Sequence, residues 1–162
     1  MTYDFNVDEM FEMAIRIEEN GARFYRKAAQ LQSDPLNREM LEKLETMENR
    51  HKQTFEKMRD QVSGVEKTAT VFDPAGEASQ YLIAMADSHR GEGNPAVADS
   101  LTGEESIAEI VDIAIGLEKE SILFYLGLKD LVPPDYGRDK LDGIIGEERR
   151  HIIQLNGIRR KL

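Results

Sequence analysis

Residues 147–151 of the chain read EERRH, and residues 47–51 read MENRH. In each stretch a glutamate precedes a histidine by three positions, and these residues are Glu48, His51, Glu148 and His151. Side chains three positions apart project from the same side of a helix. Leucine, isoleucine, phenylalanine and methionine recur around both pairs at spacings of three and four, which is the helical pattern. The sequence therefore predicts two helices that present a glutamate and a histidine from an otherwise apolar face.

The two stretches are part of a longer internal repeat. Residues 7–60 and residues 107–160 align without a gap and share 13 identities in 54 positions. The matched residues include both Glu-x-x-His pairs together with a glutamate and a tyrosine upstream of each, namely Glu18, Tyr25, Glu118 and Tyr125. This repeat predicts two helical hairpins built on one plan.

Four long segments show the helical spacing of apolar residues, so the expected fold is all-α. Capping residues indicate where each helix begins. The expected start signals are Asn6 with Glu9, Asp34 with Pro35, Thr102 with Glu105, and Pro133 with Pro134. Together the four segments predict a four-helix bundle.

About forty residues separate the second and third long segments, and they are rich in Gly, Pro, Asp and Ser. A short helix is expected among them, starting at Asp73 and Pro74, with Tyr81, Leu82 and Met85 on its apolar side. One long connection between the middle helices can carry the chain back along the length of a bundle. The predicted plan is a single domain over residues 1–162, made of a hairpin at 7–62, a crossover at 63–102 and a hairpin at 103–161.

The composition limits the classes of partner. Lys and Arg total 21 against 31 Asp and Glu, a formal net charge of −10, which repels the phosphates of nucleic acids and anionic lipids. The first ten residues, MTYDFNVDEM, have neither a basic start nor an apolar run, so a cytoplasmic location is expected. The chain has no cysteine, which excludes disulfides, thiolate zinc sites and iron–sulfur clusters built from its residues. We therefore expect no nucleic-acid or membrane partner, and any bound metal must use histidine, carboxylate or water ligands.

Six acidic and imidazole side chains are predicted to meet inside the bundle. Glu18 lies seven positions from both Phe11 and Tyr25, and Glu118 holds the equivalent place in the third helix, so both belong to core-facing stripes. Buried carboxylates that face one another are costly unless cations neutralise them, and no Lys or Arg lies on these stripes near the same level. Two divalent cations would balance four glutamates, with two histidines completing the ligand set. The predicted metal ligands are Glu18, Glu48, His51, Glu118, Glu148 and His151.

The donor types also indicate the metal. Carboxylate and imidazole ligands without thiolate suit iron or manganese. One Glu from each of two helices, with Glu-x-x-His from each of the other two, is the ligand plan of di-iron and di-manganese carboxylate bundles. A lone Glu-x-x-His on a helix is more often an ordinary packing or surface pair, so the prediction depends on all six residues together.

Four segments resemble the rubrerythrin branch of the ferritin-like superfamily, and they are IEENGARFY (17–25), ENRH (48–51), LEKESILFY (117–125) and ERRH (148–151). The resemblance implies a ferritin-like bundle that holds two iron ions per chain, or two manganese ions. It also implies that Glu18 and Glu118 bind from the first and third helices, while Glu48 and Glu148 bridge or chelate beside the histidines. Rubrerythrins use such a centre to reduce hydrogen peroxide, and a homodimer is expected.

The chain departs from the rubrerythrin pattern in two ways. Full-length rubrerythrins add a rubredoxin domain with a cysteine-bound iron, so electrons are expected here from a separate protein such as a rubredoxin. Rubrerythrins also carry an extra glutamate one turn after the third-helix ligand, where this chain has Ser121. Peroxidase activity therefore has less support in the sequence than metal binding.

Two tyrosines and three glutamates near the predicted ligands have simpler explanations. Tyr25 and Tyr125 could hydrogen-bond a ligand carboxylate or a bound oxidant, although packing in the core is the preferred interpretation. A solvated helix face accounts for Glu19, Glu120 and Glu147.

Two arginines and one further histidine are weaker functional candidates. Arg50 and Arg150 are expected to point outward and to form ion pairs with neighbouring glutamates. His89 lies in the predicted crossover and is expected to be exposed.

The leading hypothesis is a di-iron oxidoreductase of rubrerythrin type that reduces peroxide or dioxygen. A ferritin-like protein that oxidises and stores iron would use the same ligands but needs a hollow cage. A metal-free helical interaction module is the third alternative, and it would keep its stability after exhaustive chelation.

Overall fold

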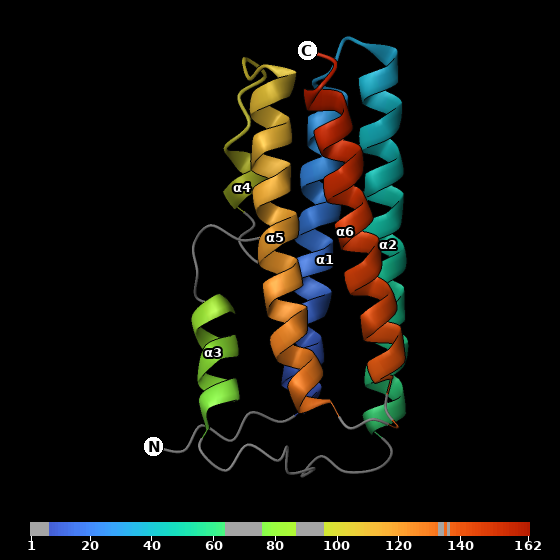
Figure 1. Ribbon diagram of the computed structural model, residues 1–162, viewed down its shortest axis with the longest axis vertical. Helices are drawn as coiled ribbons and strands as arrows, with labels where there is room; N and C mark the ends of the chain where they lie inside the picture. The colour runs from blue at the N-terminus through green and yellow to red at the C-terminus, as the bar shows by residue number, and fades with distance from the viewer. Residues whose placement is uncertain (1–6, 64–75, 87–95, 133–134, 136) are drawn as a thin grey trace.

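The structure is a computed structural model that describes residues 7–63, 76–86, 96–132, 135 and 137–162. These residues form helices and no strand, which confirms the expected all-α class (Figure 1). The helices are α1 (Val7–Gln30), α2 (Pro35–Ser63), α3 (Glu77–Ala86), α4 (Ala96–Asp99), α5 (Ile107–Leu131) and α6 (Arg138–Arg159). The four long helices form the predicted four-helix bundle.

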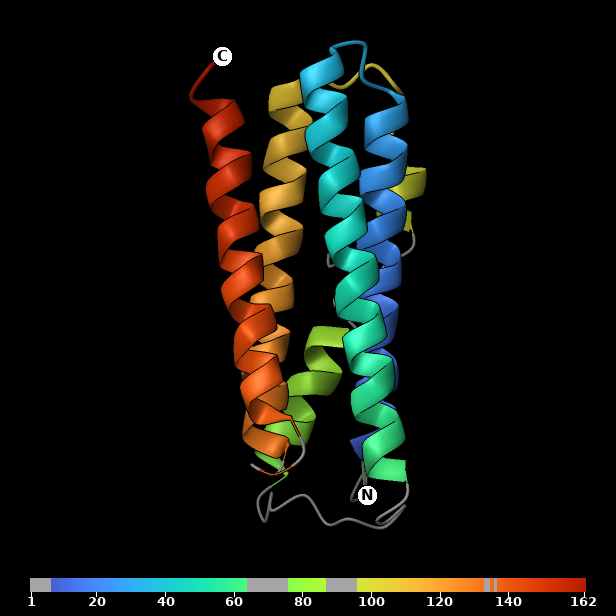
Figure 2. The same ribbon diagram turned by 90° about the vertical axis from the view of Figure 1, so that its right-hand side faces the viewer.

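The bundle consists of two helical hairpins that pack side by side along their length. Helix α1 packs mainly against α2, and α5 packs mainly against α6. Helices α1 and α6 run in one direction along the bundle, whereas α2 and α5 run in the other (Figure 2). Helix α3 packs on α5 and the short α4 packs on α1, so both lie outside the four-helix core. This arrangement has the one long connection between the second and third long helices that the sequence predicted; α4 was not anticipated.

The start of α2 agrees with the expected cap. The side-chain oxygen of Asp34 accepts hydrogen bonds from the backbone amides of Leu36 at 2.8 Å and Asn37 at 3.2 Å. Pro35 is the first helical residue, where its fixed φ and missing N–H are tolerated. Asp34 therefore satisfies amide groups that the first turn of the helix leaves without intrahelical partners.

The start of α5 lies four residues later than expected. The capping box is formed by Ser106 and Glu109, each side chain bonding to the other's backbone amide. The expected pair also interacts, because Glu105 accepts a hydrogen bond from the Thr102 amide at 2.8 Å, but it does so in the turn before the helix. The Gly103 backbone has a φ of +90°, a conformation incompatible with a continuous helix from Thr102.

The other expected helix starts are only partly described. Helix α6 begins at Arg138 after Gly137, later than the prolines at 133 and 134 suggested. The capping residues proposed for α1 and α3 lie outside the described residues, as do both of those prolines, and the group is Asn6, Asp73, Pro74, Pro133 and Pro134.

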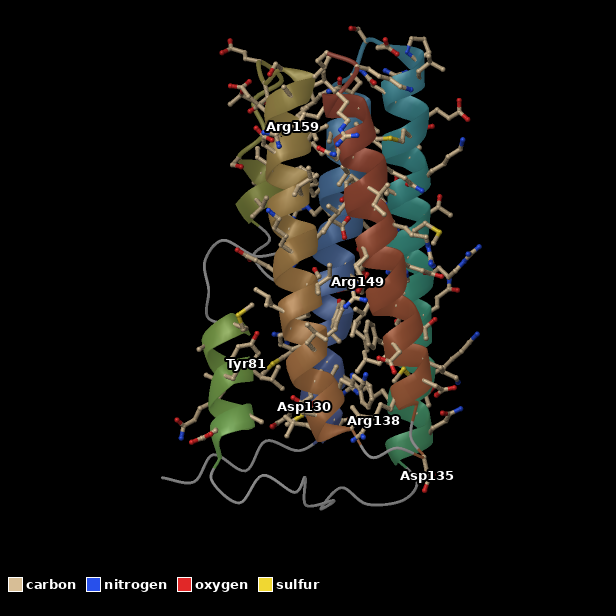
Figure 3. All side chains as sticks on the ribbon, in the orientation of Figure 1. Tyr81, Asp130, Asp135, Arg138, Arg149 and Arg159 are labelled. Atoms are coloured by element: carbon tan, nitrogen blue, oxygen red, sulfur yellow. The ribbon has the colours of Figure 1, made fainter. Side chains whose placement is uncertain are left out.

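One repeated arginine closes each hairpin. Arg38 donates to the carbonyl of Gln32 at 3.0 Å, and Arg138 donates to the carbonyl of Val132 at 2.8 Å. The two acceptors are themselves related by the offset of one hundred positions. Arg138 lies where the end of α5 meets the beginning of α6 (Figure 3). The repeat identity at this position thus has a structural reason, since each guanidinium binds carbonyls that follow a helix end.

Buried apolar side chains form two separate clusters along the bundle. The first, called here the Phe55 cluster, includes Met10, Phe11, Phe55, Met58, Phe124, Tyr125, Leu128 and Leu141. The second, called the Tyr25 cluster, includes Phe24, Tyr25, Leu41, Leu44, Ile110, Val111, Ala114 and Leu155. The buried polar residues in the described part of the chain belong to neither cluster.

Candidate metal centre

All six predicted ligands meet in the interior of the bundle. Each long helix supplies at least one of them, because their positions lie on the core-facing stripes of α1, α2, α5 and α6. Every one of these side chains is buried, with at most 2% of the residue surface exposed. The six residues are called here the central Glu/His cluster: Glu18, Glu48, His51, Glu118, Glu148 and His151.

The cluster contains two overlapping groups of metal-ligating atoms. The first group consists of Glu18, Glu48, His51 and Glu148. The second consists of Glu48, Glu118, Glu148 and His151. Within each group, one ligand atom per residue lies within 4.8 Å of all the others. Glu48 and Glu148 belong to both groups, which is the arrangement that two neighbouring cations with shared carboxylates require.

Both histidines direct the same ring nitrogen into the cluster. Nδ1 of His51 lies 3.0 Å from Glu148 and 3.4 Å from Glu18. Nδ1 of His151 lies 2.9 Å from Glu148 and 3.3 Å from Glu118. The two rings stack with their centroids 5.7 Å apart and their planes 20° from parallel. Each group therefore receives one imidazole nitrogen from its own side.

The two tyrosines connect the hairpins through hydrogen bonds to the cluster. The Tyr25 hydroxyl donates to Glu118, and the Tyr125 hydroxyl donates to Glu18. Each tyrosine thus supports the glutamate of the opposite repeat. Both rings pack in the core as preferred from the sequence, but the hydroxyls also make the hydrogen bond that was the less favoured alternative. A helical pattern shows which face a side chain occupies but not which neighbouring helix it reaches.

Burial and mutual contact shift the pKa values of the cluster strongly. Burial would lower the pKa of His51, but hydrogen bonds to Glu148 and Glu18 raise that pKa to about 12. Against the same effect of burial, contacts with Glu118 and Glu148 raise the pKa of His151 to about 9. Burial, followed by repulsion from Glu148, raises the pKa of Glu118 to about 8 and also raises that of Glu18.

Glu148 is the exception among these glutamates. Burial would raise its pKa, but hydrogen bonds to His151 and His51 hold the pKa well below its usual range. Without cations, the central Glu/His cluster is therefore stabilised by protons held on its imidazoles and on Glu18 and Glu118 beside the charged Glu148 carboxylate. Cations can replace these protons.

The donor set fits two hard or borderline cations. Among the described residues, the buried carboxylate oxygens and both Nδ1 atoms of the cluster face one another, and several of them, such as Oε2 of Glu118, make no hydrogen bond of regular geometry. Buried polar atoms normally have partners, so inward-facing oxygen and nitrogen atoms without them indicate a ligand. Oxygen donors with one imidazole on each side suit iron or manganese.

Glu147 differs from the solvated residue that was expected. Its Oε2 atom lies 2.5 Å from Nε2 of His51, on the ring edge opposite the cluster. Its other carboxylate oxygen lies 3.8 Å from the Arg150 guanidinium, the ion pair expected for that arginine. No periodic pattern predicts this contact, because position 147 lies beside the core stripe of α6 and reaches α2 only through the packing of the two helices.

Three other residues lie beside the ligands in the sequence, and they differ in their exposure to solvent. Glu19 is exposed and pairs with Lys52 at 2.6 Å, as a solvated face requires. Glu120 is only half-buried and has one buried carboxylate oxygen, so it is less solvated than expected. Ser121 is buried and its hydroxyl donates to the carbonyl of Leu117 at 3.1 Å.

Of the three other candidates, both arginines point outward as expected, but only Arg150 shows the expected ion pair, and Arg50 instead donates to the sulfur of Met47 at 3.8 Å. Arg50 and Arg150 are exposed. His89 lies outside the described residues.

Two pockets between α2 and α6 reach the histidine edges. One has a volume of about 360 Å³, includes His51 in its wall, and has the basic side chains of Arg50, Lys57 and Lys140 around it. The other, of about 340 Å³, includes His151. Glu147 contributes to the walls of both pockets. Small molecules can thus approach the cluster from the seam between these two helices.

Comparison with known proteins agrees with this geometry. The family model named Rubrerythrin matches residues 1–59. A crystal structure of a ferritin-like diiron-carboxylate protein from Thermotoga maritima is 26% identical, with a TM-score of 0.68, and the match covers 96% of this chain and 95% of that one. The comparison with curated proteins found no match.

Fold, ligand groups and both matches together define the class of protein. The chain is a member of the ferritin-like di-iron superfamily, with a buried Glu/His cluster suited to iron. The resemblance inferred from the sequence is confirmed at this level. Within the described parts of the chain, no helix combines the length and apolar character needed to span a membrane.

Proposed function

We propose that the chain is a cytoplasmic di-iron oxidoreductase that reduces hydrogen peroxide or dioxygen with electrons from a separate donor protein. The single observation that carries this proposal is the pair of ligand groups that share Glu48 and Glu148. A pair of neighbouring metal ions can transfer two electrons to one bound oxidant, which is the number that peroxide reduction requires. The balanced reaction converts one peroxide, two protons and two electrons into two waters.

The six cluster residues have distinct proposed roles. Glu18 and His51 would hold one iron ion, Glu118 and His151 the other, and the two shared glutamates would hold both. When bound, the two iron ions supply the electrons and the coordination positions for the oxidant. The protein supplies a preformed anionic site, so that charge built up during oxidation of the metal is balanced by carboxylates.

The surrounding residues support the same function. The hydroxyls of Tyr25 and Tyr125 fix the orientation of the two unshared glutamates, which limits their movement as the site changes charge. The pockets beside His51 and His151 supply a route for a small oxidant and for water. Larger substrates are excluded, since every cluster residue is buried.

The electron donor is proposed to be a separate protein such as a rubredoxin. The 162 residues contain no cysteine, so they cannot build a thiolate-bound iron of their own. We further propose that the protein acts as a homodimer. Size-exclusion chromatography with light scattering tests this point, and a large shell that takes up many iron ions per chain would instead support storage of oxidised iron.

The direct test is a reaction of peroxide with the iron-loaded protein. Anaerobic loading with Fe(II) should give about two iron ions per chain, following the ligand plan of this class. One equivalent of hydrogen peroxide per chain should then convert both ions to Fe(III), followed by Mössbauer and absorption spectroscopy. An unchanged spectrum after peroxide addition would contradict the proposed activity.

The ligand assignment has its own test. Glu18→Ala and His151→Ala should each lower the metal content, because each removes a ligand from one group. Glu19→Ala is the matched control, since it removes an exposed carboxylate that pairs with Lys52. Wild-type metal content in both ligand variants would show that the assignment is wrong.

A further inference from the structure

The two halves of the central Glu/His cluster are nearly equivalent. Each half has one unshared glutamate, one histidine that directs Nδ1 inward, and one tyrosine from the opposite hairpin. These residues are related by the same offset of one hundred positions. A strictly repeated structure would bind two metal ions with equal affinity.

The two halves differ at the Nε2 edge of their histidines, which faces away from the cluster. Nε2 of His51 has the Glu147 carboxylate at 2.5 Å. The residue that corresponds to Glu147 in the first repeat is Met47, which lies with His151 in the wall of one pocket. Among the described residues, Nε2 of His151 is buried and has no hydrogen-bond partner. Only one of the two imidazoles therefore has a carboxylate at its Nε2 edge.

This difference matters for a histidine that binds metal through Nδ1. Its Nε2 atom must then carry the ring proton, and a carboxylate that accepts this proton fixes the tautomer and the ring orientation and makes the ring a stronger donor. At its Nε2 edge, the ring of His151 is positioned by packing alone, and a thioether such as that of Met47 is at most a weak acceptor. Glu147 itself belongs to neither ligand group.

We propose that Glu147 is a positioning residue that makes the two metal positions unequal, so that the position of Glu18 and His51 binds first and more tightly. This inference rests on the proposed function, because it requires that the cluster bind metal. The tighter position, at His51, would keep its metal ion. The position at His151 lies behind the pocket that contains Met47, and there the metal ion would exchange or the oxidant would bind. The two repeats thus differ at this position, Met47 against Glu147, while the ligand residues are the same in both.

The inference is tested by anaerobic titration with cobalt(II) alone, followed by calorimetry and visible absorption. The His151→Ala variant isolates the His51 position, and the His51→Ala variant isolates the His151 position. In the His151→Ala protein, Glu147→Met should weaken cobalt binding by about 10–100-fold, the usual effect of removing such a partner. In the His51→Ala protein, the same substitution should leave the affinity within about threefold.

Two further variants separate positioning from a general structural effect. Glu147→Gln keeps an acceptor oxygen, so it should restore part of the affinity that Glu147→Met loses. Glu19→Met, the matched control on an exposed glutamate, should leave cobalt binding unchanged.

Circular dichroism of the metal-free variants checks that the bundle is intact. Equal losses in both histidine backgrounds, or no loss in the His151→Ala protein, would overturn the inference. If the parent protein binds neither cobalt nor iron, the proposed function itself is wrong.

Discussion

The central Glu/His cluster and the two apolar clusters on either side of it are equally buried but are stabilised by different forces. Removal of apolar side chains from water is favourable in itself, so the Phe55 and Tyr25 clusters stabilise the bundle without a ligand. Buried carboxylates beside one another are unfavourable unless protons or cations compensate them. The two apolar clusters therefore account for the stability of the metal-free bundle, whereas the central Glu/His cluster is the part suited to binding cations.

The largest expected effect is the loss of stability on removing a ring from the Phe55 cluster. The Phe55 ring lies 5.0 Å from Tyr125 and 6.4 Å from Phe11, between centroids, and it is fully buried. Phe55→Ala should lower the free energy of unfolding of the metal-free protein by about 3–5 kcal/mol, measured by urea denaturation. Leu36→Ala, at a residue that is 76% exposed, serves as control with an expected change below about 0.5 kcal/mol. A loss below about 1 kcal/mol for Phe55→Ala would contradict the claim that the apolar clusters stabilise the metal-free bundle.

The next largest expected effect is stabilisation of the folded protein by cations bound in the central Glu/His cluster. A cation at 100 times its dissociation constant should add about 2.7 kcal/mol per site to the free energy of unfolding, because it binds only the folded chain. Thermal denaturation with manganese(II), and again after exhaustive chelation, measures this difference. Identical melting in both conditions would support the metal-free interaction module instead.

Metal affinity should also rise with pH. The pKa values of about 12 for His51, 9 for His151 and 8 for Glu118 mean that the metal-free cluster holds protons at neutral pH. Cations must displace these protons, so affinity should increase about tenfold, or 1.4 kcal/mol, per pH unit for each proton released. As pH rises above about 9, Glu118 and His151 have already lost their protons, so the slope should decrease. Cobalt(II) titrations at pH 6, 7 and 8 measure the slope, and an affinity that falls over this range would contradict the prediction.

The smallest expected effect lies where the two regions meet. Tyr125→Phe keeps the ring in the Phe55 cluster but removes the hydrogen bond to Glu18, so it should cost about 0.5–1.5 kcal/mol in urea denaturation. Tyr25→Phe should behave alike, since its hydroxyl has the equivalent place beside Glu118. Tyr81→Phe is the control, because that tyrosine is 39% exposed. A larger loss for Tyr81→Phe than for the other two would show that the buried hydroxyls do not support the cluster.

Much of the site was predictable because helical periodicity places side chains on faces. Glu18 and Glu118 were assigned to core-facing stripes by their spacing from apolar neighbours, and both are fully buried. The local start of a helix was harder to predict. Thr102 with Glu105 and Ser106 with Glu109 are both plausible capping pairs in the sequence, and only the turn at Gly103 decides between them.

By itself, the sequence determined the helical class, the repeat of two hairpins and the inward position of four glutamates and two histidines, because each of these follows from local spacing along a helix. Only the tertiary structure decided which helices each side chain contacts: that Tyr25 and Tyr125 cross to the opposite hairpin, and that Glu147 lies behind His51. Those contacts depend on the rotation and height of each helix relative to its neighbours. Packing of the whole bundle sets these quantities, and no short stretch of sequence contains them.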